Sequence, residues 1–186
     1  MRLPVIAAIL ATVAACGPLA PAADTAQLPP GVFGASDQDV PAAEYAQFAF
    51  ADAARTYGNP VAGAQAVLAM DYLAGQLNTS PRWANIEATT QMQLLQGREQ
   101  TRAAVGIAPN APSQLVVNSL VAARNDLAAG NKDAAAKDLD NAAFPGGGAK
   151  AVQALANLPY IRIANIATQN AAEALTGPND RNRPPF

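Results

Sequence analysis

The chain has 186 residues and a formal net charge of −2; 46 residues, about a quarter, are alanine, whereas 5% are aromatic and 14% charged. Lysine and arginine do not cluster, so we expect no nucleic-acid partner. The chain has no histidine and one cysteine, Cys16, which removes the commonest transition-metal ligand, the usual general base and any intramolecular disulfide.

The first residues have the pattern of an export signal. Met1 and Arg2 precede the apolar stretch LPVIAAILATVAA at residues 3–15. This stretch is too short for a membrane span of about 20 residues, but it suits the hydrophobic region of a secretory signal. Its end, Val13-Ala14-Ala15-Cys16, resembles the lipobox of bacterial lipoproteins, in which an aliphatic and two small residues precede the cysteine that is lipidated.

This resemblance implies that residues 1–15 are a cleaved signal peptide, that the Cys16 sulfur carries a diacylglycerol, and that a further acyl chain is added to the amine that cleavage exposes. Two or more chains anchor a protein stably, whereas one binds a bilayer only marginally. Gly17 stands where an aspartate favours retention in the inner membrane of enteric-type bacteria, so the resemblance implies the outer membrane. The alternative is an ordinary signal peptide that leaves Cys16 as a free thiol.

The mature chain divides into three parts. Residues 16–38 contain the lipidated cysteine and a stretch rich in proline, glycine and alanine, which predicts a semi-extended linker. Residues 39–177 show helical spacing and form the predicted helical domain. Residues 178–186 are predicted to be a disordered tail.

The domain is predicted to be all-α, an antiparallel bundle of six or seven alanine-rich helices. Asp39, Asn59 and Asn131 are predicted N-caps, and Ser80-Pro81 is predicted to start the third helix. The helices are expected at about 39–57, 60–78, 81–105, 113–129, 132–142 and 149–175, the last with a kink near Pro159.

Within the last helix, Ile163, Ile166 and Ala167 are expected to face the core, and Arg162, Asn165, Gln169 and Glu173 to face solvent. Residues 119–145 resemble one tetratricopeptide-type hairpin with Gly130 at its turn, but the aromatic signature of that family and a second copy are missing. An unrelated antiparallel helix pair is the alternative.

The chemical motifs are few. Asp133, Asp138 and Asp140 form the densest acidic group, on a helix face that we expect to be solvated. The candidate binding cluster is Asp71, Tyr72, Arg82 and Trp83, because tryptophan, tyrosine and arginine are enriched at binding hot spots. The alternative is that Tyr72 and Trp83 simply pack in the core.

These patterns favour a non-enzymatic lipoprotein without cofactor or metal, a helical binding or assembly module that faces the periplasm. Its expected partners are the lipid bilayer, through acylated Cys16, and a protein of the cell envelope. A bundle that binds a small molecule or lipid near Tyr72, Trp83 and Met92 is the second hypothesis. The third is a hydrolase of cell-wall glycan that uses two carboxylates.

Overall fold

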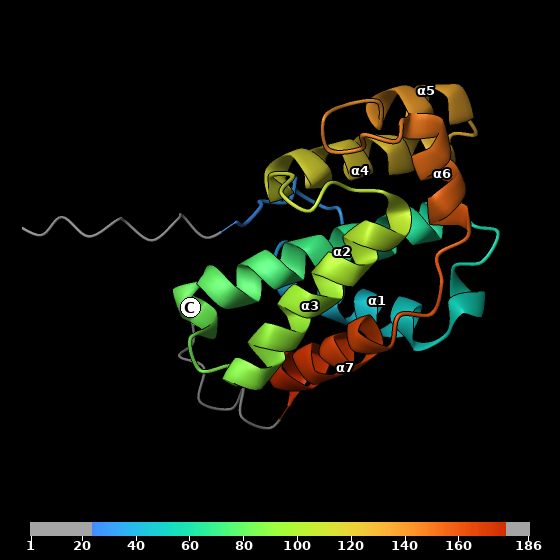
Figure 1. Cartoon of the computed structure of the whole chain (residues 1–186). Coiled ribbons are helices and arrows are strands. Elements are labelled where there is room, and N and C mark those ends of the chain that lie inside the picture. The colour runs from blue at the N-terminus through green and yellow to red at the C-terminus, as the bar shows by residue number, and fades with distance from the viewer. Residues whose placement is uncertain (1–23, 178–186) are drawn as a thin grey trace, which may run out of the picture.

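The computed structural model describes residues 24–177 (Figure 1). Within these residues the chain forms seven α-helices, two short 3-10 turns and no strand, which confirms the predicted all-α class. The elements are α1 (Asp39–Ala51), η1 (Ala53–Arg55), α2 (Pro60–Thr79), η2 (Pro81–Trp83), α3 (Ala88–Val105), α4 (Ser113–Ala128), α5 (Lys132–Asp138), α6 (Gly148–Ala156) and α7 (Arg162–Thr176).

Helix α2 is the centre of the bundle. Helices α1, α3, α4 and α6 all pack against it, and most of its residues are buried. Alanine and glycine in α2 let the neighbouring helices approach closely. At Gly63 the contact is so tight that a Cβ atom would lie 2.0 Å from the carbonyl oxygen of Leu155 in α6.

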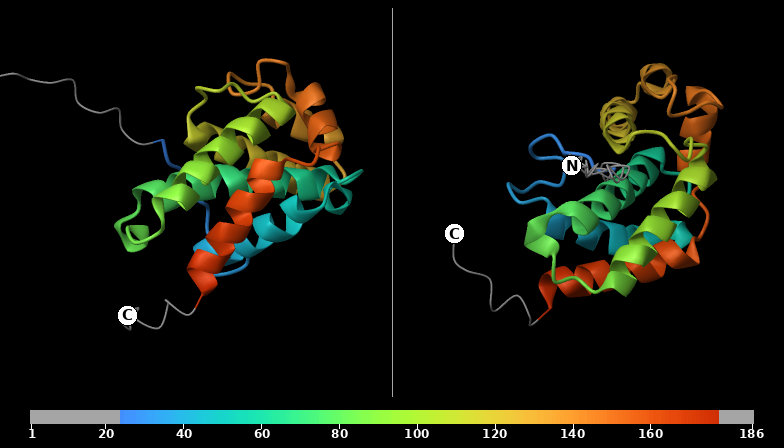
Figure 2. Two further views of the ribbon diagram at one scale, coloured as in Figure 1. Left: turned by 60° about the horizontal axis from the view of Figure 1, so that its bottom comes forward. Right: turned by 60° about the vertical axis from the view of Figure 1, so that its left-hand side comes forward.

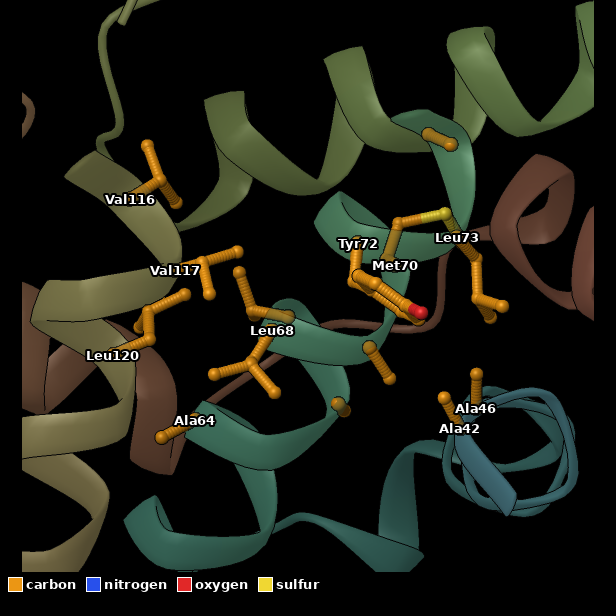
Figure 3. Packing of buried hydrophobic residues seen from close by; sticks show 14 of the residues in the cluster. Ala42, Ala46, Ala64, Leu68, Met70, Tyr72, Leu73, Val116, Val117 and Leu120 are labelled. Atoms are coloured by element: carbon orange, nitrogen blue, oxygen red, sulfur yellow. The ribbon is translucent and has the colours of Figure 1, made fainter. Parts of the chain in front are cut away.

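Figure 3 shows the two sides of this core. Leu68 of α2 lies toward Val117 and Leu120 of α4, whereas Leu73 lies toward the alanines of α1, among them Ala46. Large aliphatic side chains therefore fill the α2–α4 interface, and small ones allow the close approach of α1.

Helices α5, α6 and α7 pack against the other helices at two further places. Helix α7 lies against α1 and α3, as Figure 2 also shows, and α5 with α6 covers one end of α2 and α4. The last helix, predicted over 149–175 with a kink near Pro159, is instead two separate helices, α6 and α7, and Pro159 lies in the segment between them. None of the helices in residues 24–177 has both the length and the apolar character needed to cross a membrane.

Several local predictions are confirmed. The Asn59 side chain accepts a hydrogen bond from the Ala62 N–H (3.1 Å), and that of Asn131 accepts one from the Ala134 N–H (3.2 Å), so both residues cap helices. Gly130 has a φ of +80° at the turn between α4 and α5, a conformation that glycine adopts without steric cost. Helices α4 and α5 thus form the expected antiparallel hairpin.

Other local predictions are wrong. The third helix begins at Ala88 rather than at residue 81, because the chain first makes the η2 turn that brings Trp83 into the interior. Asp39 is the first residue of α1 and does not act as its cap. Asn165 is buried, not solvated, and its amide donates to the Phe50 carbonyl (3.2 Å). The fifth helix, predicted to run to about residue 142, ends at Asp138, so that Ala142 is exposed and its neighbour Ala143 is buried.

The described part of the predicted linker, residues 24–38, packs on the bundle, and we name this segment the strap. Ala26 and Val32 of the strap are buried, and Arg124 of α4 donates a hydrogen bond to the Val32 carbonyl (3.0 Å). At Gly75 of α2 a Cβ atom would lie only 2.8 Å from the Cα atom of Thr25. The folded body therefore includes residues from position 24 onward, not from 39. The predicted signal peptide, Cys16 and the C-terminal tail lie outside the described residues.

Candidate functional site

The buried carboxylate of Asp39 accepts hydrogen bonds from three side chains on one side of the molecule. Asp39, at the start of α1, is 2% exposed. Its carboxylate accepts hydrogen bonds from the Tyr72 hydroxyl, from Trp83 Nε1 (2.7 Å) and from Arg82 (3.3 Å). We name these four residues the Asp39 cluster. A carboxylate that is buried away from water needs hydrogen bonds from the protein, and the three donors of the cluster supply them to Asp39.

Three elements position this cluster. Tyr72 comes from the middle of α2, and the η2 turn supplies both Arg82 and Trp83. The Arg82 guanidinium lies 4.5 Å above the centre of the Trp83 ring, a cation–π geometry, and also pairs with Asp37 of the strap. The cluster therefore joins the strap and α1 to the end of α2.

The cluster also sets the protonation of Tyr72 and of the neighbouring Asp37. Burial, and then the hydrogen bond to Asp39, raise the pKa of the Tyr72 hydroxyl, so this group remains a donor. The hydrogen bond from Arg82 lowers the pKa of Asp37 below its usual value despite partial desolvation. At neutral pH Asp37 is thus a carboxylate and cannot supply a proton.

A groove opens beside the Asp39 cluster. Its volume is about 670 Å³, and its walls come from the strap, the start of α1 and one side of α2. The lining includes Gln27, Ser36, Gln76 and Arg82. These amide, hydroxyl and guanidinium groups can form hydrogen bonds with a polar ligand, for example the backbone of a peptide.

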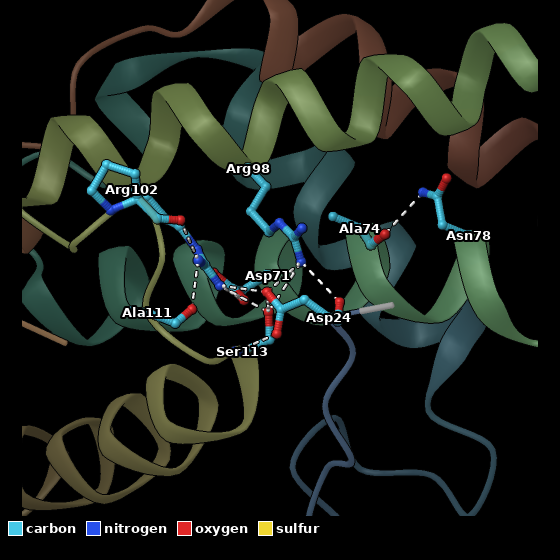
Figure 4. A network of polar contacts seen from close by, with 9 residues as sticks. Asp24, Asp71, Ala74, Asn78, Arg98, Arg102, Ala111 and Ser113 are labelled. Carbon is cyan, nitrogen blue, oxygen red and sulfur yellow. Dashed lines mark hydrogen bonds and ion pairs between the residues drawn. The ribbon is translucent and has the colours of Figure 1, made fainter. Parts of the chain in front are cut away.

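A second polar network lies on another side of α2 (Figure 4). Asp71 and Arg102 are 1% and 3% exposed, and they form a bidentate pair with N–O distances of 2.7 and 2.8 Å. Arg102 also donates to the Ala111 carbonyl (2.8 Å) and to Ser113 Oγ (2.8 Å). This network fastens α3 and the loop before α4 to α2.

The first described residue, Asp24, belongs to this second network. Its carboxylate accepts from the N–H and from the hydroxyl of Ser113, both at 2.8 Å, and lies 3.3 Å from Arg98. Partial burial acts to raise the pKa of Asp24, but the bonds from Ser113 and the charges of Arg98 and Arg102 hold it below its usual value. The Asp24 carboxylate therefore accepts a hydrogen bond from the backbone N–H of Ser113, the first residue of α4, which has no acceptor within the helix.

The structure divides the predicted binding cluster. Tyr72, Arg82 and Trp83 meet at Asp39, whereas Asp71 points to Arg102 instead. Tyr72 and Trp83 are both 7% exposed, so they pack in the interior while their polar atoms bind Asp39. The sequence pattern identified neither Asp37 nor Asp39 as a site residue.

The other acidic group lies in α5 and just after it. Asp133 and Asp140 are exposed near α5. Desolvation, and then Asp126, raise the pKa of Asp138. In residues 24–177 no group of three or more histidine, cysteine, aspartate or glutamate residues is placed to hold a metal ion.

No family model, curated protein or solved structure matches this chain. A function is therefore inferred from its own residues.

Proposed function

We propose that the protein is an exported lipoprotein whose acylated Cys16 holds a non-enzymatic helical binding or assembly module at the outer membrane, facing the periplasm. The observation that carries the proposal is the apolar stretch of residues 3–15 followed by the lipobox-like Val13-Ala14-Ala15-Cys16. An anchor on Cys16 leaves the helical body free to meet other envelope components.

The groove beside the Asp39 cluster is the proposed binding surface of the module. It combines hydrogen-bonding side chains of the strap and of α2 with a frame that is already rigid, since three donors hold Asp39 in place. A preformed polar groove binds a partner with little loss of side-chain freedom.

The chemistry of the groove supports a non-enzymatic role. A carboxylate hydrolase needs one acid that is protonated near neutral pH and a second carboxylate that is free to react. In the groove, the bond from Arg82 lowers the pKa of Asp37, and three donors occupy Asp39. The lowered pKa makes Asp37 a poor proton donor at neutral pH, and the carboxylate of Asp39 is not free to react.

The hypothesis of an internal lipid site has less support. It requires Tyr72, Trp83 and Met92 to line one apolar cavity. Tyr72 and Trp83 are each 7% exposed and bonded to Asp39, whereas Met92 is 58% exposed on the outside of α3. The three side chains therefore do not share a cavity.

The anchor is tested by fractionation and mass spectrometry of the full chain from cells. We expect the wild-type protein in the outer-membrane fraction, with a mature N-terminal peptide that begins at acylated Cys16. The Cys16→Ser variant lacks the sulfur that carries the diacylglycerol and should leave the membrane fraction. An unmodified Cys16, or a wild-type protein that stays in the cytosol, would refute the proposal.

The binding surface is tested by crosslinking in intact cells. A photoreactive amino acid replaces Ser36, which lines the groove and is exposed, and in a control chain it replaces the exposed Asp133 of α5. We expect a discrete adduct with an envelope component from position 36 only. Equal adduct patterns at the two positions, or none at position 36, would argue against the groove as a binding surface.

A further inference from the structure

The segment between the proposed lipid-bearing residue and the folded body is short. Residues 17–23 separate Cys16 from Asp24, and eight peptide units span at most about 26–29 Å. Asp24 itself is fixed to α3 and α4 through Arg98 and Ser113 (Figure 4). The site of lipidation therefore lies within about 29 Å of this point of the body.

This limit favours one orientation of the body. The strap passes α2 at Gly75, near the C-terminal end of that helix. In Figure 1 the described chain begins at the left, in blue, whereas the turn before α2 lies at the right. Gly75 and Pro60 are about 22 Å apart along the helix. If the Pro60 end lay on the bilayer, the tether would need most of its full length to reach.

Apolar side chains are exposed on α3 and α4, the two helices to which Asp24 is bound. Leu115, 36% exposed, lies in the first turn of α4, two residues after Ser113. Leu95, 39% exposed, lies one turn before Arg98 in α3, and Met92, 58% exposed, lies one turn earlier. We name Met92, Leu95 and Leu115 the anchor-side residues. Such side chains lose unfavourable contact with water when they enter a membrane interface.

The ion pair of Asp24 and Arg98 at this place is compatible with such a contact. The Asp24 carboxylate lies 3.3 Å from Arg98 and accepts two hydrogen bonds from Ser113. Bringing the surface to a bilayer therefore leaves neither member of the Asp24–Arg98 pair without its partner.

We infer that the anchor-side residues touch the headgroup region of the bilayer, so that the lipoprotein lies on the membrane in one orientation with η1 pointing away. This inference rests on the proposed acylation of Cys16. It adds a second, apolar contact with the same membrane, made by the folded body.

The test labels the acylated full-length protein at one position at a time. Because the thioether occupies the sulfur of the native cysteine, an introduced cysteine is the single reactive thiol. Leu95→Cys and Leu115→Cys place a fluorophore on the anchor side, and Tyr57→Cys and Tyr160→Cys are exposed controls at 73% and 54%. Each protein is reconstituted into phosphatidylethanolamine–phosphatidylglycerol vesicles that contain a lipid with a nitroxide headgroup.

We expect quenching at positions 95 and 115 to be at least about threefold stronger than at 57 and 160, since interfacial contacts lie within about 5–10 Å of the headgroups. Equal quenching at all four positions, or stronger quenching at the controls, would overturn the inferred orientation. Mass spectrometry of the same samples separates the two proposals. If Cys16 is acylated but quenching is uniform, only the orientation is wrong, and if Cys16 is bare, the lipoprotein proposal fails.

Discussion

The buried pair of Asp71 and Arg102 allows a sharp prediction for stability. Replacing Arg102 by methionine removes both hydrogen bonds to Asp71 and the bonds to the Ala111 carbonyl and the Ser113 hydroxyl. Methionine keeps much of the aliphatic volume of arginine, so the main consequence is electrostatic. The Asp71 carboxylate, 1% exposed, would be left inside the bundle without its cation.

The size of the effect follows from that unpaired charge. Removing one partner of a buried ion pair costs about 3–5 kcal/mol. A domain of this size has a free energy of unfolding of about 5–15 kcal/mol, so Arg102→Met should remove a large part of its stability. The double variant Asp71→Asn/Arg102→Met has no buried charge at this place and should regain about half of the loss or more.

Urea unfolding followed by circular dichroism at pH 7 measures these differences. Arg124→Met is the matched control, because Arg124 is partly exposed and donates to the Val32 carbonyl from outside the core. The free energy of unfolding of Arg124→Met should be lower than that of the wild type by less than about 1 kcal/mol. A loss below about 1.5 kcal/mol for Arg102→Met, or a double variant no more stable than the single one, would refute the reasoning.

Two further changes test the packing and the Asp39 side of the molecule. Gly63→Ala should lower the free energy of unfolding by about 1–2 kcal/mol, because the new Cβ would lie 2.0 Å from the Leu155 carbonyl oxygen, although helix propensity alone favours alanine by about 1 kcal/mol. Gly97→Ala, whose tightest contact would be 3.2 Å, should be close to neutral in the same urea unfolding assay. The hydrogen bond from Arg82 lowers the pKa of Asp37 in the folded state. The contribution of Asp37 to the free energy of unfolding is therefore complete above the unfolded pKa of about 3.9, and it is lost as the pH falls through the folded pKa. The difference in unfolding free energy between the wild type and Asp37→Asn should therefore shrink on acidification below about pH 4, and a difference that grows would contradict this assignment.

Features that depend on neighbouring residues were predictable from the sequence. Asn59 and Asn131 cap helices because their own side chains reach an N–H three residues later. Gly130 marks the end of α4 because the turn requires a positive φ. Such signals need no knowledge of the rest of the fold, so the order and number of the helices could be predicted.

Features that depend on distant residues were not predictable in this way. The third helix starts late because the Trp83 indole reaches Asp39, which lies 44 residues earlier. Asn165 has the polarity of a surface residue, but it lies inside because it donates to the carbonyl of Phe50, 115 residues earlier. Helical periodicity locates a face but does not identify the partner of that face.

The division of the predicted cluster, in contrast, follows from helix geometry alone. Asp71 and Tyr72 are adjacent in α2, and adjacent positions of a helix project about 100° apart. Two such side chains cannot both reach one small site, so one of them had to find another partner. Asp71 meets Arg102 of α3, and Tyr72 meets Asp39 of α1. Adjacency in the sequence is therefore a poor criterion for grouping site residues on a helix.

These two networks also explain why the strap belongs to the bundle despite its composition. Proline and glycine disfavour a helix in residues 24–38, but carboxylates at both ends of the segment bind the body. Asp24 binds Ser113 and Arg98, and Asp37 binds Arg82. In the proposed lipoprotein, only seven residues connect the acylated Cys16 to Asp24, which is bound to α3 and α4. A tether that ends in the packed bundle restricts how the body can turn on the membrane, whereas a linker that ran free to residue 38 would not.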